Sequence, residues 1–232
     1  MRTKAMFFAW GGLAAAVVGW AWLTPLATAQ SGGTIEAAVT YGGAPVVEKL
    51  KVNKDVEQCG QDQAIEKIAV GANKGLASAV VSLAGAVSGG APKKVVLDQK
   101  GCRFQPGVVA TTPGDVDIAN SDGILHNVHT YSTANPSLNK AQPKFKKIMT
   151  EKFDKPEYIK VQCDVHSWML GWIAVMPNAY HGITDTSGAT KLDNVPAGKH
   201  TVEVWHPELG KQAKDVEVKA GQVTKVSFEM KK

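Results

Sequence analysis

Hydrophobic and polar residues alternate over short runs along most of this 232-residue chain. Gly, Pro, Asn or Asp bounds each run, as is typical of half-buried β-strands. Long stretches with a helical period are missing, and only residues 56–68 have a pattern that fits one short helix. The pattern predicts an all-β sandwich with strands at residues 34–39, 76–83, 95–97, 108–111, 116–118, 128–131, 158–162 and 171–176.

The first 29 residues have the pattern of a secretory signal peptide. Arg2 and Lys4 precede an apolar run at residues 5–23, and residues 27–29 (Ala-Thr-Ala) resemble a signal-peptidase site. Cleavage after Ala29 would give a periplasmic or otherwise exported protein, and no later stretch is long and apolar enough to cross a membrane. An uncut membrane anchor is the alternative, because the apolar run is nearly long enough to span a bilayer.

A second unit is expected to begin after Pro177. Turn sequences at residues 184–188 and 195–198 bound alternating runs at 200–205, 213–218 and 223–228. About fifty residues with this rhythm make a small β-sandwich that is marginal alone and packs on its neighbour. We therefore expect a first domain at residues 30–176 and a small β-sandwich at residues 177–232.

Charge and motif content argue against several function classes. Removal of the signal peptide would lower the formal net charge from +5 to +3, which is too mild to indicate nucleic-acid binding. The sequence has no Gly-x-Ser-x-Gly elbow, no His-Glu-x-x-His motif and no phosphate-binding glycine-rich loop. We therefore expect neither an enzyme nor a nucleic-acid-binding protein.

The segment at residues 139–160 is rich in lysine and contains prolines at positions 143 and 156. Its weak periodicity predicts a long loop. An ordinary solvated loop is the favoured interpretation. The alternative is a docking surface that attracts an acidic partner through long-range electrostatic steering.

Three cysteines in an exported chain leave one without a disulfide partner. We expect Cys59 and Cys102 to pair, because an oxidising compartment makes two free thiols the less favoured alternative. Cys163 is then the thiol with another use.

The stretch Cys163-Asp164-Val165-His166-Ser167-Trp168-Met169 lies between two predicted strands. A thiolate, an imidazole and a thioether at this spacing converge only if the loop wraps around one point. Two soft ligands and a borderline one suit copper in both oxidation states, and two histidines with one cysteine and a weak axial methionine form a blue-copper site. The second imidazole must come from elsewhere, and His126, just before the strand at 128–131, is the candidate.

This combination resembles the cupredoxins, the plastocyanin and amicyanin group. The resemblance rests on the His126-Asn127 pair that enters a strand and on the short Cys-x-x-His-x-x-Met loop, and it covers residues 95–176 well. It implies a cupredoxin-like Greek-key β-sandwich with one mononuclear copper ion, bound by equatorial His126, Cys163 and His166 and by axial Met169. It also implies that the Asn127 side chain ties the two ligand-bearing segments together.

The remaining histidines are assigned other roles. His129 should point to the opposite face of its strand from His126, so a surface histidine is favoured over a second ligand. His181, His200 and His206 lie in or beside the C-terminal unit, which looks like a carboxypeptidase-regulatory or transthyretin-like module, and are expected to be structural or solvent-facing. Copper is favoured over zinc, because affinity peaks at Cu(II) and a thioether adds little for zinc.

The resemblance implies a one-electron carrier between redox partners, such as a cytochrome or a copper enzyme. A periplasmic copper chaperone or store is the alternative, and it would use the same residues. A third interpretation is an interaction protein in which the copper domain is vestigial. The intact set of four ligands argues against that third interpretation.

Overall fold

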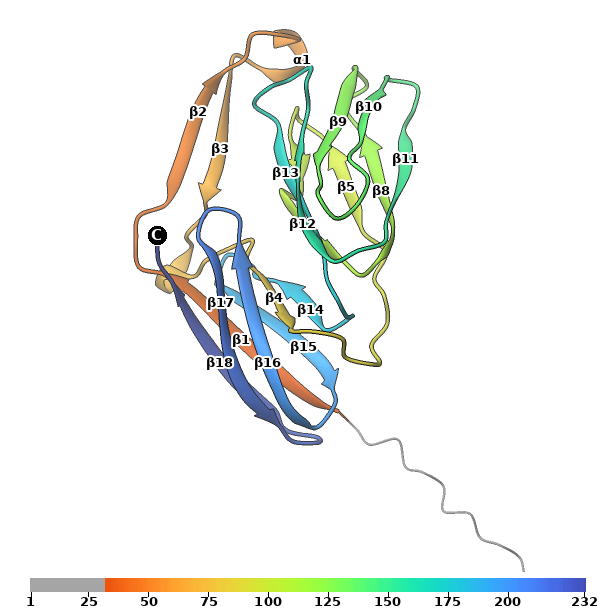
Figure 1. Cartoon of the computed structure of the whole chain (residues 1–232). Helices are drawn as coiled ribbons and strands as arrows, with labels where there is room; N and C mark the ends of the chain where they lie inside the picture. Colours follow the sequence, from red (N-terminus) through yellow and green to blue (C-terminus); the bar gives the residue numbers. More distant parts are fainter. Residues whose placement is uncertain (1–31) are drawn as a thin grey trace, which may run out of the picture.

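A computed structural model describes residues 32–232, which fold into strands with two short helical turns. The predicted signal peptide at residues 1–29 lies outside the described residues and stays a prediction. The strands form two β-sandwiches and a two-stranded arm (Figure 1). The all-β fold class predicted from the sequence is confirmed.

The first sandwich packs a five-stranded sheet against a four-stranded sheet around one apolar core. In β8 every second residue from Val116 to Asn120 is buried, as expected for a strand with one face on a core. The sheet ordered β10-β9-β12-β13-β7 consists of β7 (Val108–Thr111), β9 (His126–Tyr131), β10 (Asn139–Gln142), β12 (Glu157–Gln162) and β13 (Leu170–Val175). The sheet ordered β11-β8-β5-β6 consists of β5 (Val96–Gln99), β6 (Phe104–Gln105), β8 (Gly114–Asn120) and β11 (Ile148–Phe153).

The second sandwich has its own core and packs a three-stranded sheet against a four-stranded sheet. The sheet ordered β15-β1-β18 consists of β1 (Gly33–Tyr41), β15 (Ala189–Val195) and β18 (Val223–Met230). The sheet ordered β14-β4-β16-β17 consists of β4 (Val80–Leu83), β14 (His181–Ile183), β16 (Gly198–His206) and β17 (Gly210–Val218). A short 3-10 turn, η1 (Ala72–Lys74), precedes β4.

The strand pairing corrects the predicted domain boundaries at residues 30–176 and 177–232. β1 pairs in parallel with β18 and antiparallel with β15, and β4 lies between β14 and β16. The second sandwich therefore contains strands from both ends of the described chain, and the first sandwich is inserted between β4 and β14. Alternation along a strand indicates that one face is buried, but it does not identify the sheet that the strand joins.

A hairpin arm made of β2 (Val46–Lys51) and β3 (Asp62–Ile68) reaches from the second sandwich to the first (Figure 1). Ile68 at its base belongs to the core of the second sandwich, whereas Val52 and Cys59 near its tip belong to the core of the first. The tip carries the one-turn helix α1 (Val56–Cys59). The predicted helix at residues 56–68 is thus wrong beyond residue 59, because pairing with β2 draws the rest into a strand.

The disulfide predicted between Cys59 and Cys102 is confirmed, with a Cα–Cα distance of 5.4 Å. It fastens the tip of the arm to the first sandwich. Cys163 is the free cysteine of the described chain, and it is buried.

The lysine-rich segment at residues 139–160 is not one long loop, which corrects that prediction. It contains β10, β11 and most of β12, joined by short turns. The strands escaped the sequence pattern because they are short and largely exposed, with only Gln142 buried in β10 and only Met149 and Phe153 buried in β11.

A third apolar cluster joins the two sandwiches. Trp205 of β16 stacks on Tyr158 of β12 with ring centroids 4.1 Å apart and meets Trp172 of β13 edge-on. Within residues 32–232, no helix has the length and apolar character needed to cross a membrane.

Removal of the disulfide should lower stability without dismantling the fold. We expect the double variant Cys59→Ser/Cys102→Ser to lose roughly 4 kcal/mol of unfolding free energy, because the bridge constrains the unfolded chain over a separation of 43 residues. Urea unfolding followed by tryptophan fluorescence measures the loss. Thiol counting in the unfolded, unreduced protein is the control, and three reactive thiols instead of one would contradict the pairing.

Candidate metal centre

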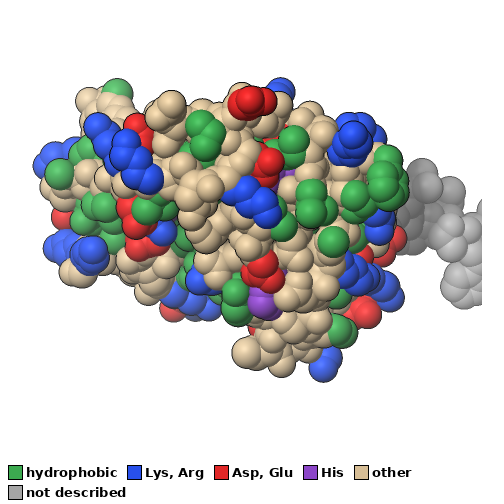
Figure 2. Space-filling model, turned by 90° about the horizontal axis from the view of Figure 1, so that it is seen from above, with side chains coloured by type: hydrophobic (Ala, Val, Ile, Leu, Met, Phe, Trp, Pro, Cys, Tyr) green, Lys and Arg blue, Asp and Glu red, His purple; other side chains and the backbone are tan. Residues whose placement is uncertain are grey.

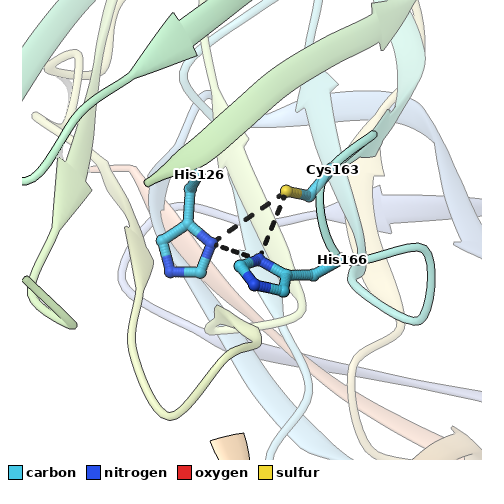
Figure 3. Close-up of side chains that lie close together, drawn as sticks. All are labelled: His126, Cys163 and His166. Atoms are coloured by element: carbon cyan, nitrogen blue, oxygen red, sulfur yellow. Dashed lines mark hydrogen bonds between the residues drawn. The ribbon is translucent and has the colours of Figure 1, made fainter. Parts of the chain in front are cut away.

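Three predicted ligands meet at one end of the first sandwich. His126 is the first residue of β9, Cys163 directly follows β12, and His166 lies on the loop between β12 and β13. β9 and β12 are antiparallel neighbours, so the start of β9 and the end of β12 lie at the same end of the sheet. Figure 3 shows the two rings and the sulfur pointing toward one another.

The distances among the three ligand atoms fit a trigonal metal site. The Nδ1 atoms of His126 and His166 are 3.0 Å apart, and Cys163 Sγ lies 4.0 and 3.8 Å from them. One point in their plane is about 2.1 Å from each nitrogen and about 2.2 Å from the sulfur, close to the lengths of transition-metal bonds to imidazole and thiolate. The side chains therefore need little movement to bind a metal ion.

Two carboxylates that sequence reasoning missed hold the outer nitrogens of the rings. His126 Nε2 donates to Asp122 at 2.9 Å, and His166 Nε2 donates to Asp55 at 2.8 Å. A carboxylate only accepts hydrogen bonds, so each Nε2 carries a proton and each Nδ1 presents a lone pair. This arrangement of a carboxylate behind a ligating histidine is the usual support of metal-binding imidazoles.

The Nδ1 atoms of His126 and His166, which face each other, then form a site that favours a bound cation. Two lone pairs held 3.0 Å apart repel each other unless a proton or a metal ion lies between them. Burial lowers the pKa of His126, against the opposing effect of Asp122, so a second proton on that ring, at Nδ1, is disfavoured. The donor set and this unrelieved repulsion together fit a bound metal ion.

The thiol of Cys163 holds its proton more strongly than an exposed thiol does. Burial raises the pKa of Cys163 above its ordinary value, despite hydrogen bonds from the backbone of Asn127, Val165 and His166 that favour the thiolate. A metal ion that binds the thiolate displaces that proton. All three ligand residues are almost completely inaccessible to solvent.

Asn127 links the two ligand-bearing segments. Its backbone N–H donates to Cys163 Sγ at 3.3 Å, and its side-chain oxygen accepts from the backbone N–H of Asp164 at 3.1 Å. Its side-chain nitrogen donates to Asn139 of β10. The contacts have the form that the cupredoxin resemblance implies for this residue.

The fourth predicted ligand, Met169, is fully buried in the same apolar cluster as Cys163. Its backbone N–H donates to the carbonyl of His166 at 2.9 Å, which closes the loop between them. The axial role of its thioether stays a prediction.

The other histidines lie outside the cluster formed by the three ligand residues. His129 is partly exposed, is stacked on Tyr131 and contacts Asp164 at 3.0 Å. His181 and His206 are buried in the second sandwich and His200 is partly buried there. Burial lowers the pKa of His206 to about 4, so it is neutral at pH 7.

The arm and the disulfide brace both carboxylates. Asp55 lies at the arm tip, four residues before Cys59, in a left-handed conformation with φ 50°. The backbone N–H of Cys102, the disulfide partner, donates to Asp122 at 2.8 Å. The arm therefore places a carboxylate on His166 from outside the sandwich, and the same bridge fixes the loop that orients the other carboxylate.

Comparisons with known proteins give partial likenesses. No protein-family model matches the sequence, and no curated protein matches it. Among solved structures, the chain is similar to amicyanin from Paracoccus versutus, with 16% identity over 41% of this chain and 96% of that one and a TM-score of 0.32. It is similar to a purple cupredoxin from Nitrosopumilus maritimus, with 16% identity over 36% and 99% of the two chains and a TM-score of 0.30.

A third likeness is to a copper-containing nitrite reductase from Thermus scotoductus SA-01. The identity is 25% over 40% of this chain, the alignment spans only 25% of the reductase, and the TM-score is 0.31. TM-scores this low carry no activity, ligand or partner over to this chain.

Proposed function

We propose that this protein is an exported, mononuclear type I copper protein that carries one electron at a time between redox partners. The observation that supports the proposal best is the convergence of two imidazole Nδ1 atoms and one thiol sulfur in a buried triangle. Met169, next to this triangle in sequence, would be the weak axial ligand. The cupredoxin resemblance of residues 95–176 supports the same interpretation.

The donor set favours copper over zinc. A bound copper ion would supply one-electron chemistry by alternating between Cu(I) and Cu(II). Soft thiolate and thioether donors with two imidazoles are compatible with both states, whereas a structural zinc site takes four strong ligands in a tetrahedron. The chain provides three strong ligands, His126, Cys163 and His166. This number matches a copper site with two imidazoles and one thiolate rather than a structural zinc site.

The chain would contribute to electron transfer by holding the ligands rigidly and by excluding water from the metal site. Two of the ligands flank paired strands, both imidazoles are fastened by carboxylates, and Asn127 holds the sulfur. Such bracing limits rearrangement when the charge at the site changes, and the buried apolar surroundings exclude water. The chain would supply no catalytic step of its own.

A copper chaperone or store is the rival function. Such a protein has to pass its metal to a partner, which requires ligands that a partner can reach. The burial of all three ligand residues favours the carrier.

The test is to load the mature chain with Cu(II) and to record visible absorption, electron spin resonance and voltammetry. We expect an intense thiolate-to-copper charge-transfer band and a reversible one-electron wave with the metal retained in both states. A colourless copper complex would contradict the type I site. An intense band combined with release of the metal on reduction would contradict the carrier and favour the store.

A further inference from the structure

An exposed segment with basic and apolar side chains connects β10 to β11, and we call residues 144–148 the basic segment. Lys144, Lys146 and Lys147 are exposed, and the intervening Phe145 has 81% of its surface accessible to solvent. Ile148, at the start of β11, is 60% exposed. Exposed apolar patches rimmed by polar side chains mark surfaces that contact another protein.

The basic segment lies at the same end of the sandwich as the first imidazole ligand. In the β9–β10 register Gln142 is opposite His126, so the chain after Gln142 runs beside the loop that precedes His126. The side-chain nitrogen of Asn120 donates to the carbonyls of both Ile124 and Gln142. Leu125, directly before His126, is 44% exposed. The apolar and basic side chains thus occupy one end surface near the candidate metal centre.

The backbone of the basic segment is fixed although its side chains are free. Lys146 N–H donates to the carbonyl of Pro143, and the Lys146 carbonyl accepts from the side chain of Gln142. The Lys147 carbonyl accepts from the backbone of Asn120 at 2.9 Å. The backbone of a surface held in this way loses little conformational entropy when a partner binds.

The positive charge of the basic segment is not neutralised locally. None of Lys144, Lys146 and Lys147 forms an ion pair with the described residues 32–232, whereas Lys140 of β10 pairs with Glu151. Figure 2, which views the molecule from above, shows Lys and Arg side chains (blue), apolar side chains (green) and Asp and Glu side chains (red) mixed on the face turned to the viewer. Three lysines within four residues, none of them in an ion pair with a described residue, attract negative charge at long range.

The second imidazole is closed to a partner from its own side. His166, like His126, is fully buried, and its outer nitrogen is bonded to Asp55 on the arm tip, whereas the carboxylate on His126, Asp122, is itself buried. Asp55 is 38% exposed, so an acidic surface that approached there would meet a negative charge. The surface beside His126 is the approach on which charge and apolar contact act together.

We propose, on the basis of the carrier function above, that the basic segment and Leu125 form the docking surface for an acidic face of a redox protein. Lysines of the segment steer the partner, while Phe145 and Leu125 make the apolar contact. The partner and the copper centre then exchange one electron, so that one is oxidised as the other is reduced, and no bond or proton is transferred.

The test uses the copper-loaded chain and two small oxidants of opposite charge, hexacyanoferrate(III) and tris(phenanthroline)cobalt(III). The variant Lys144→Glu/Lys146→Glu/Lys147→Glu is compared with a matched control of equal charge change, Lys199→Glu/Lys219→Glu/Lys225→Glu. The control lysines are exposed on the second sandwich. Stopped-flow absorption of the charge-transfer band gives the oxidation rate of the reduced protein at an ionic strength of about 0.1 M.

We expect the basic-segment variant to react with the anion at least about tenfold more slowly and with the cation faster. The control should change each rate by less than about twofold, because charges beyond the Debye length of about 10 Å at 0.1 M salt are largely screened. Equal effects of the two variants would overturn the docking surface. Because every comparison is made on proteins that show the charge-transfer band, failure of the copper site itself would appear separately, as loss of that band.

Discussion

Replacement of Cys163 by serine should abolish the visible charge-transfer band and leave a protein with weak copper binding. The hydroxyl of serine keeps its proton at neutral pH and is a hard donor, so it replaces neither the charge nor the softness of the thiolate. The sulfur also has no substitute, because Cys59 and Cys102 are consumed in the disulfide. We expect the copper dissociation constant to rise by more than about 100-fold. A rise of about 100-fold is the upper end for substitutions of residues that only form hydrogen bonds to a ligand, and Cys163 is itself the ligand.

The measurement is titration with Cu(II) under a competing chelator, followed by absorption and electron spin resonance. Ser167→Ala is the matched control, because Ser167 is exposed on the same loop. Its band and affinity should equal those of the wild type. Retention of the band in Cys163→Ser would refute the assigned ligand, whatever the affinity.

Neutralising the carboxylates behind the imidazoles should raise the reduction potential of the copper. Asp122 accepts from His126, Gly101 and Cys102, and its side chain is only 4% exposed. Its negative charge stabilises Cu(II) more than Cu(I), so Asp122→Asn removes stabilisation from the oxidised form. If Cu(II) affinity falls by the 10–100-fold typical of such supports while Cu(I) affinity is unchanged, the potential rises by about 60–120 mV.

Asp55→Asn should shift the potential in the same direction by a smaller amount, because Asp55 is more exposed and water screens its charge. Protein-film voltammetry at fixed pH measures both shifts. Asp154→Asn is the control for net charge, since Asp154 is an exposed residue between β11 and β12 that pairs with Lys152. A fall in potential in Asp122→Asn, or equal shifts in all three variants, would contradict this role of the carboxylates.

The sequence predicts the ligands of the candidate site that lie close together in the chain or next to a predicted strand. Cys163, His166 and Met169 share one short loop, and His126 stands just before the strand predicted at residues 128–131. The two carboxylates have no such signal. Asp55 is separated from His166 by 111 residues and reaches it only because an exposed hairpin crosses from one sandwich to the other. Asp122 is an ordinary turn residue in the sequence, and its function depends on the fold of the loop around it.

The accuracy of the predicted fold is limited for a similar reason. Strands with one buried face, such as β8 and β12, follow from alternation, because burial of one face selects mainly apolar residues at every second position. β2 and β10 are mostly exposed and carry no such pattern, so pairing alone defines them. The pairing of β1 with β18 depends on contacts across nearly two hundred residues, which no local pattern encodes.

The insertion of one sandwich into the other also sets an order of events during synthesis and refolding. β1 pairs with β18 from Thr34–Val223 to Tyr41–Met230, so its partner strand is the last to be made. The inserted sandwich has all of its own strands together in the chain and can close first, since short loops between strands favour early pairing. Until β18 pairs with it, β1 has one unpaired edge to which strands of other chains can bind. The yield of folded protein will therefore depend on how well this edge of β1 is protected from aggregation.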